Sequence, residues 1–239
     1  MPSPAYSISA LNETALLVSY GNTIQEAIND RVISLHQSFR TEPFIGLVET
    51  VPSYSSLTVF YDPLLVRNGH PGVRSAADLV KAIVRQRADT MNETPALFKK
   101  KTVIIPVYYH GEDLDFVASQ NNLSKEEVIT LHHSRTYRVF MIGFLPGFPY
   151  MGPVDEGIAT ARRSSPRTKV KAGSIGIAGF QTGIYPLDSP GGWQLIGETP
   201  LKIFDKMKEP VCLLAASDEV RFVPITREEF ERQDEYHHS

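Results

Sequence analysis

The sequence has little of several features that would narrow its chemistry at once. Its 239 residues include a single cysteine, Cys212, which excludes an intramolecular disulfide and a cluster of thiolate metal ligands. Cys212 lies in the apolar run VCLLAA, where a small buried side chain is far more frequent than a nucleophile. The formal net charge is -3, so the chain has no overall basic field, and we expect no nucleic acid partner.

Long apolar runs and short catalytic motifs are also missing. No segment approaches the roughly 20 apolar residues that span a bilayer, and no basic stretch near the N-terminus leads into an apolar one. We therefore expect a cytoplasmic protein with no membrane partner. The sequence contains no GxxxxGKS/T phosphate loop, GxSxG elbow or HExxH zinc motif. Any ATP chemistry would not use a P-loop of this chain.

The first part of the chain alternates strands and helices. Apolar residues spaced three and four apart over 24–39 and over 76–84 indicate two amphipathic helices. Strand patterns surround them at 15–20, 45–51, 56–61 and 101–109. The order strand, helix, strand, strand, helix, strand predicts a ferredoxin-like, split β-α-β layer, with two helices on one face of an antiparallel sheet.

The second part of the chain is rich in short strands. Two helices are predicted first, at 113–120 and 124–133, each with a plausible capping residue, and the second opens on a capping box from Ser124 to Glu127. Strands are then expected at 137–142, 174–178, 181–185, 194–198, 201–204, 211–215 and 219–223. Such a series predicts a barrel or sandwich. We expect an α+β chain with domains at residues 1–104 and 105–239.

Two irregular segments carry aromatic and cationic residues suited to binding. The loop GFLPGFPYMG at 143–152 places Phe144, Phe148 and Tyr150 among three glycines and two prolines, so these rings either plug one end of the barrel or form the wall of a small-molecule pocket. The segment 161–173 contains five cations and no acidic residue, a composition that suits a carboxylate or phosphate. These cations are Arg162, Arg163, Arg167, Lys169 and Lys171, and Arg167 is expected to be held most rigidly.

The segment 179–197 adds polar groups and two large rings. Gln181 offers both a donor and an acceptor and Thr182 a hydroxyl, a combination that suits the edge of an amide or lactam. Tyr185 and Trp193, the only tryptophan, are expected as pocket walls.

The adjacent His132 and His133 do not predict a metal site. Neighbouring side chains on a helix diverge by about 100°, so one histidine should pack inward and the other meet solvent. His133 lies where this helix leads into the loop-rich half and is kept as a polar site candidate. No metal is evident from the sequence.

The second half of the chain contains three long motifs, TYRVFMIGFLPGFPYMG, SSPRTKVKAGSIGIAG and QTGIYPLDSPGGWQLIGETP. They resemble those of the bacterial family of 5-oxoprolinase B subunits, whose members also carry the names allophanate hydrolase subunit 1 and KipI, an inhibitor of a sporulation histidine kinase. The resemblance covers nearly the whole chain and implies a ferredoxin-like N-terminal domain followed by a cyclophilin-like β-barrel. Phe180 departs from the family pattern, which has glycine there, and a ring at this position would narrow the pocket.

The resemblance also implies a function that is shared with partner proteins. Together with subunits A and C, this chain would open 5-oxo-L-proline to L-glutamate with hydrolysis of ATP. ATP is a cofactor of the complex, and the resemblance does not require this chain to bind it. The residues expected to bind substrate are Arg163, Arg167, Lys169, Gln181, Thr182, Tyr150, Tyr185, Trp193 and His133; no residue is an evident nucleophile or general base.

Three other functions stay open at this point. The chain could be a KipI-type protein that inhibits a sensor histidine kinase, or a carboxyltransferase-like subunit of a urea or allophanate pathway that needs a biotin carrier in trans. Proline isomerisation ranks last, because a cyclophilin-like barrel alone does not carry that function.

Overall fold

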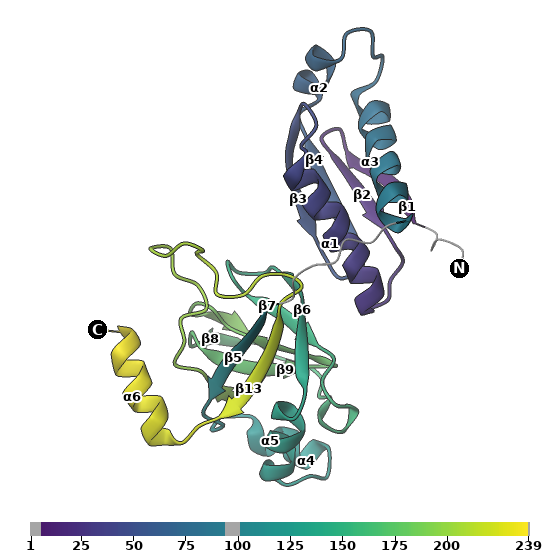
Figure 1. The fold of residues 1–239 in the computed structure, drawn as a ribbon. Coiled ribbons are helices and arrows are strands. Elements are labelled where there is room, and N and C mark those ends of the chain that lie inside the picture. The colour runs from purple at the N-terminus through teal and green to yellow at the C-terminus, as the bar shows by residue number, and fades with distance from the viewer. Residues whose placement is uncertain (1–5, 94–100, 239) are drawn as a thin grey trace. The chain divides into compact units, whose positions relative to one another are not determined.

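The structure is a computed structural model that describes residues 6–93 and 101–238. The chain divides into two compact units between residues 99 and 100 (Figure 1). Each unit has a sheet and a hydrophobic core of its own. Within the described ranges, no helix combines the length and the apolar character needed to cross a membrane.

The N-terminal unit is a four-stranded antiparallel sheet, in the order β1-β2-β4-β3, covered by helices. Side chains of β4 alternate between buried and half-buried, and Leu57 and Val59 pack with Leu35 and Val80 of the helices. Ser75 caps the third helix by accepting from the Asp78 N–H at 3.2 Å. The elements are β1 (Ser7–Asn12), β2 (Ala15–Ser19), α1 (Glu26–Thr41), β3 (Leu47–Pro52), β4 (Ser56–Tyr61), α2 (Pro63–Gly69) and α3 (Ala76–Glu93).

The predicted last strand of this layer was assigned to the wrong sheet. The strand expected at 101–109 is β5 (Thr102–Val107), and it pairs in parallel with a strand near the other end of the chain, in the sheet of the second unit. The place beside β2 is taken by β1, which the sequence did not reveal because its side chains are mostly exposed and lack a buried apolar alternation.

The second unit is built on a seven-stranded, mixed sheet in the order β12-β9-β10-β7-β6-β13-β5, with β11 and β8 forming a separate pair. The elements that follow β5 are α4 (Leu114–Gln120), α5 (Lys125–His133), β6 (Thr136–Ile142), β7 (Pro149–Gly152), the 3₁₀ turn η1 (Glu156–Ile158), β8 (Arg167–Val170), β9 (Ser174–Ala178), β10 (Gln181–Ile184), β11 (Ser189–Gly191), β12 (Gln194–Glu198), β13 (Glu219–Pro224) and α6 (Arg227–His238). Both predicted helices, α4 and α5, are confirmed, and the capping box at Ser124 is present.

The sheet of the second unit curls until its two outer strands approach each other at one end. Tyr108, which directly follows β5, and Glu198, the last residue of β12, exchange backbone hydrogen bonds of 2.9 and 3.0 Å. The result is a half-barrel that is consistent with a cyclophilin-like fold, and its strands can be followed in Figure 1. Its core includes Ile105, Val139, Ile177 and Val220, all buried.

Some of the predicted strands differ from the observed ones. The segments 201–204 and 211–215 are not strands, and they meet only in an isolated bridge between Phe204 and Cys212. The strands β7, β8 and β11 were not predicted, because each has three or four residues and contains proline or cations in place of an apolar alternation.

Candidate functional site

Three segments of the second unit, far apart in sequence, meet around a hollow of about 400 Å³ that we call the aromatic pocket. Its wall includes Phe144, Tyr150, Arg162, Tyr185, Pro190 and Trp193. The structure therefore brings together Tyr150, Tyr185 and Trp193, the three rings that the sequence predicts as pocket walls. A pocket of this size with mostly apolar walls and one cation suits a small flat ligand.

One buried ring, Phe148, packs against the three rings that line the aromatic pocket. Phe148 is fully buried, and the centre of its ring lies 4.9 Å from that of Tyr150, 5.2 Å from Tyr185 and 5.3 Å from Trp193. Tyr150 and Trp193 also contact each other, at 5.8 Å. Of the rings in the loop at 143–152, Tyr150 therefore lines the pocket, while Phe148 is buried behind its wall in a small cluster with Tyr185 and Trp193.

The chemistry of the aromatic pocket is set by neutral rings and one guanidinium. Burial raises the pKa of Tyr150 and of Tyr185, although the nearby Arg162 lowers both, so each phenol stays a neutral donor at neutral pH. The guanidinium carbon of Arg162 lies 5.7 Å from the centre of the Trp193 ring, within the range of a cation–π contact.

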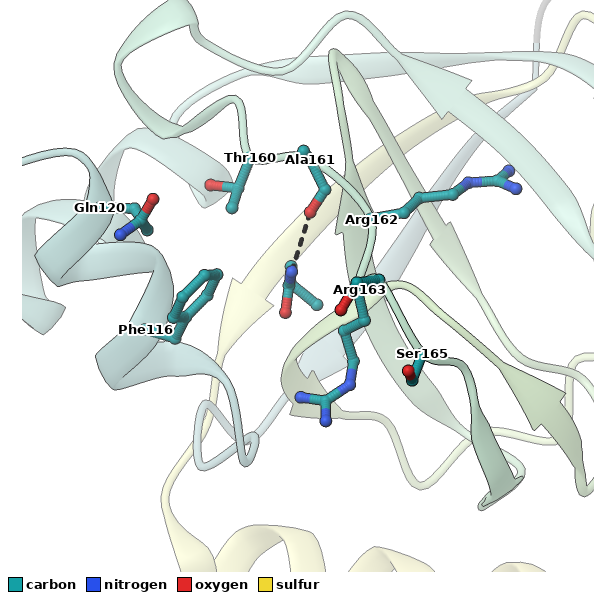
Figure 2. A pocket seen from close by; sticks show the side chains of 9 residues that line it. Phe116, Gln120, Thr160, Ala161, Arg162, Arg163 and Ser165 are labelled. Carbon is teal, nitrogen blue, oxygen red and sulfur yellow. Dashed lines mark hydrogen bonds between the residues drawn. The ribbon is translucent and has the colours of Figure 1, made fainter.

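A second hollow, of about 310 Å³, lies beside the same segment and is shown in Figure 2. We call it the polar hollow, and its wall includes Phe116 and Gln120 of α4, Thr160, Arg163, Ser165 and Gln194 of β12. The segment 161–165 borders both hollows. Arg162 lines both of them, whereas Arg163 lines the polar hollow and not the aromatic pocket. A hydrogen bond of 2.8 Å from the Arg163 N–H to the Gly192 carbonyl fixes this segment.

Arg167, the cation expected to be rigid, is paired inside the protein. Its Nη2 lies 2.7 Å from each carboxylate oxygen of Asp113, and its Nε donates to Glu112 Oε2 at 3.2 Å. Burial lowers the pKa of the Arg167 guanidinium, but the hydrogen bonds to Asp113 and Glu112 outweigh it and leave this pKa raised. Arg167 is therefore held rigidly, as predicted, but its charge is directed at Asp113.

Asp113 is the residue of this region that the sequence analysis missed. It is 4% exposed and also accepts from the Leu195 N–H at 2.6 Å and from Arg163 Nη1 at 3.1 Å. Asp113 stands at the start of α4, where an aspartate normally caps the helix, yet its side chain makes no capping hydrogen bond. The predicted cap was wrong because the carboxylate turns to two arginines that lie about fifty residues later.

Lys169, Gln181 and His133 do not line the aromatic pocket or the polar hollow. Lys169 is exposed and pairs with Asp188 at 2.9 Å, and this hydrogen bond is the main cause of the lowered pKa of Asp188. Gln181 lies in β10 opposite Ala178 of β9, and His133 is half-buried at the end of α5. Phe180, which departs from the family pattern, is 57% exposed in the turn between β9 and β10.

Thr182 faces the core of the half-barrel, where it is part of a buried hydrogen-bond chain. Its hydroxyl donates to the Gly176 carbonyl at 3.1 Å and lies 3.0 Å from His132 Nε2, whose other ring nitrogen lies 2.8 Å from the Tyr109 hydroxyl. Because the Thr182 proton goes to Gly176, its oxygen accepts from His132 Nε2–H, and His132 Nδ1 accepts from Tyr109.

His132 is fully buried, and burial lowers its pKa to about 3, with a smaller contribution from His133. The prediction of one inward and one outward histidine is confirmed for His132. Within residues 6–93 and 101–238, no three side chains of His, Cys, Asp or Glu gather as a metal site would require. Burial also raises the pKa of the Cys212 thiol, which makes it a weak nucleophile.

The sequence and the fold belong to a known class of protein. The profile of the family described as carboxyltransferase domain, subdomain C and D, matches residues 6–214. The chain is 43% identical over 229 residues to the 5-oxoprolinase B subunit of Bacillus subtilis, covering 94% of this chain and 95% of that protein. It is 38% identical over 217 residues to the 5-oxoprolinase B subunit of Escherichia coli O157:H7, covering 90% and 94%.

Solved structures agree with these matches. The crystal structure of PH0987, an uncharacterized protein of Pyrococcus horikoshii, is 44% identical and superposes with a TM-score of 0.53, covering 94% of this chain and all of that one. The chain therefore belongs to the family of 5-oxoprolinase B subunits, and its own sequence matches the carboxyltransferase domain profile.

Proposed function

We propose that this chain is the non-autonomous B subunit of a cytoplasmic, ATP-dependent 5-oxoprolinase, which acts with subunits A and C to open 5-oxo-L-proline to L-glutamate. The observation that carries the proposal is the match to two proteins of that name over at least 90% of both chains. A subunit name implies a complex, and the identity of its other members is part of the proposal.

The proposed reaction needs activation because a lactam is a poor electrophile. ATP phosphorylates the lactam oxygen, water attacks the amide carbon, the C–N bond breaks with the nitrogen leaving as an amine, and a second water releases phosphate. The described residues supply binding groups more readily than a nucleophile or base, since His132 is buried and neutral and the Cys212 pKa is raised. We therefore place the ATP chemistry on the partner subunits.

We propose that the substrate binds beside residues 161–165. Both hollows next to this segment have volumes that suit a small ligand, and each contains an arginine. Four of the predicted binding residues line these hollows: Arg163 lines the polar hollow, and Tyr150, Tyr185 and Trp193 line the aromatic pocket. Arg167 is given a positioning role, because its pairing with Asp113 connects β8 to the start of α4 and to β12.

The test is reconstitution. Purified subunits A and C from the same genome are mixed with and without this chain, and ADP release is measured with and without 5-oxo-L-proline. L-proline, which has no lactam carbonyl, is the control ligand. We expect 5-oxoproline-dependent ADP release only when all three proteins are present. Full activity without this chain would end the proposal and favour a binding protein such as a kinase inhibitor.

A further inference from the structure

The polar hollow contains a buried acceptor that no group of the described chain satisfies. Gln194 is 3% exposed, and its Nε2 donates to the Ala161 carbonyl oxygen at 2.8 Å, the bond drawn as a dashed line in Figure 2. Its Oε1 has no hydrogen-bond partner among the described residues. Buried polar atoms in native proteins are rarely left unpaired. Because the bond to Ala161 fixes which end of the amide is oxygen, the missing partner is a donor.

Groups of complementary chemistry surround this acceptor. The side chain of Arg163 is 40% exposed and meets Asp113 through Nη1 at 3.1 Å, on a carboxylate that Arg167 already neutralises. Arg167 also pairs with Glu112, so the charges of this cluster balance, and the cation that the hollow itself presents is the partly exposed side chain of Arg163. Figure 2 shows Phe116 and Arg163 on either side of the hydrogen bond at Ala161. Phe116 is 45% exposed and gives the hollow an apolar wall.

We propose that the polar hollow is the lactam-recognition site of this subunit, an inference that rests on the proposed function. The ring N–H of 5-oxo-L-proline donates to Gln194 Oε1, the carboxylate pairs with Arg163, and the ring methylenes lie against Phe116. The ligand class is a five-membered lactam with a carboxylate on the carbon next to nitrogen. Such a molecule carries one N–H donor and one anion side by side, which matches the acceptor and the cation of the hollow.

The aromatic pocket fits this ligand less well. It is larger than the polar hollow. Among the described residues, no side chain of its wall has a buried polar atom without a hydrogen-bond partner. Gln181 and Thr182, which the sequence placed at the lactam edge, do not line it. Gln194 supplies in the polar hollow the carboxamide that the sequence predicts at Gln181.

The experiment compares substrates and variants in the reconstituted complex. The substrates are 5-oxo-L-proline, its N-methyl derivative, which lacks the N–H, and 2-pyrrolidinone, which lacks the carboxylate. The variants are Gln194→Met, Arg163→Gln and Arg162→Gln, and kcat/KM is measured from ADP release. Wild type should favour 5-oxo-L-proline over the N-methyl compound by roughly 10- to 100-fold, the effect of one buried hydrogen bond.

The expected result is a change in selectivity. Gln194→Met should bring the ratio of kcat/KM for 5-oxo-L-proline to kcat/KM for its N-methyl derivative close to one. If Gln194 had only a structural role, the variant would lower kcat/KM equally for both substrates. Arg163→Gln should lower kcat/KM for 5-oxo-L-proline but not for 2-pyrrolidinone, and it carries the test should Gln194→Met fail to assemble.

Two results would overturn the inference while leaving the proposed function in place. One is a wild-type ratio that persists in Gln194→Met. The other is the carboxylate-specific loss appearing in Arg162→Gln in place of Arg163→Gln, which would put the ligand in the aromatic pocket. A wild-type complex without 5-oxoproline-dependent ADP release would overturn both proposals, and is recognised before any variant is made.

Discussion

Arg167 Nη2 lies 2.7 Å from both carboxylate oxygens of Asp113, in a pair whose side chains are only 13% and 6% exposed. This contact joins β8 to the residue before α4. The same carboxylate accepts from the Leu195 N–H, so it also fixes the start of β12, where Gln194 stands. The position of Gln194 in the polar hollow therefore depends on a buried ion pair that does not itself line that hollow.

Replacing Arg167 should be strongly destabilising. Arg167→Ala leaves the carboxylate of Asp113 buried with less compensation, and breaking such a pair costs roughly 3–5 kcal/mol. Lys169→Ala is the matched control, because Lys169 and Asp188 are 73% and 50% exposed and an exposed pair contributes less than about 1 kcal/mol. Urea unfolding of both variants measures the difference. Equal losses would show that Arg167 does not act through a buried pair.

Gly191 should not tolerate a side chain, although its neighbour should. A Cβ at Gly191 would lie 2.7 Å from Cε1 and Cζ of Tyr185, a ring that is 1% exposed and cannot move away easily. At Gly192 the nearest atoms lie at 3.7 Å, an ordinary contact. We expect Gly191→Ala to lose about 1–3 kcal/mol of unfolding free energy and to change the fluorescence of Trp193.

Gly192→Ala serves as the control for that experiment, with an expected loss of less than about 1 kcal/mol. Trp193 is the only tryptophan and lines the aromatic pocket, so its emission reports on the wall directly. An unchanged spectrum and stability in Gly191→Ala would mean that the Tyr185 wall is not packed as described.

The regular part of the fold was predictable because its pattern is local. The helices α1 and α3 follow from apolar residues three and four apart, and β9, β10 and β12 from short apolar runs between turn residues. The pairing of β5 with β13 was not predictable in this way. These strands are more than a hundred residues apart in the chain, and nothing in the run KTVIIPVYY indicates which sheet it joins.

The candidate site was predictable in its large residues and not in its polar ones. Tyr150, Tyr185 and Trp193 stand out by size and by their glycine-rich surroundings, and they do form one wall. Gln194 is a single carboxamide at the start of an apolar strand, and the sequence does not show that its Nε2 donates to the Ala161 carbonyl while its Oε1 finds no donor among the described residues. The position of Asp113 at the start of a helix predicts a cap, and its actual partner, Arg167, is too distant in sequence to be foreseen.

Substitutions of two exposed phenylalanines, Phe180 and Phe116, should affect the KM for the substrate differently. Phe180 is 57% exposed and is not part of either hollow, so Phe180→Gly should leave KM for 5-oxo-L-proline within about twofold of wild type. Phe116 is 45% exposed but lines the polar hollow, so Phe116→Ala should raise KM by roughly tenfold through lost apolar contact. A large rise in Phe180→Gly would instead indicate that its ring reaches the substrate in the complex.

His132 should make stability depend on pH in a definite direction. In the unfolded chain an imidazole binds a proton near pH 6.5, whereas burial lowers the pKa of His132 in the folded chain to about 3. Between these values the unfolded state binds one more proton, so this group's contribution is complete above pH 6.5 and is lost as pH falls toward 3. The loss is about 1.4 kcal/mol for each pH unit.

Urea unfolding at intervals from pH 7.5 to pH 4.5 measures this slope, and His132→Gln should reduce it by about 1.4 kcal/mol per unit below pH 6.5. The variant loses stability at every pH because it breaks the contacts with Tyr109 and Thr182, so the slope and not the absolute value is the readout. His133→Gln is the control and should keep the wild-type slope, since burial is the main cause of the His132 shift and His133 a smaller one. The same slope in wild type and His132→Gln would mean that the imidazole is hydrated in the folded chain and that the hydrogen-bond chain through Thr182 is not sealed from water.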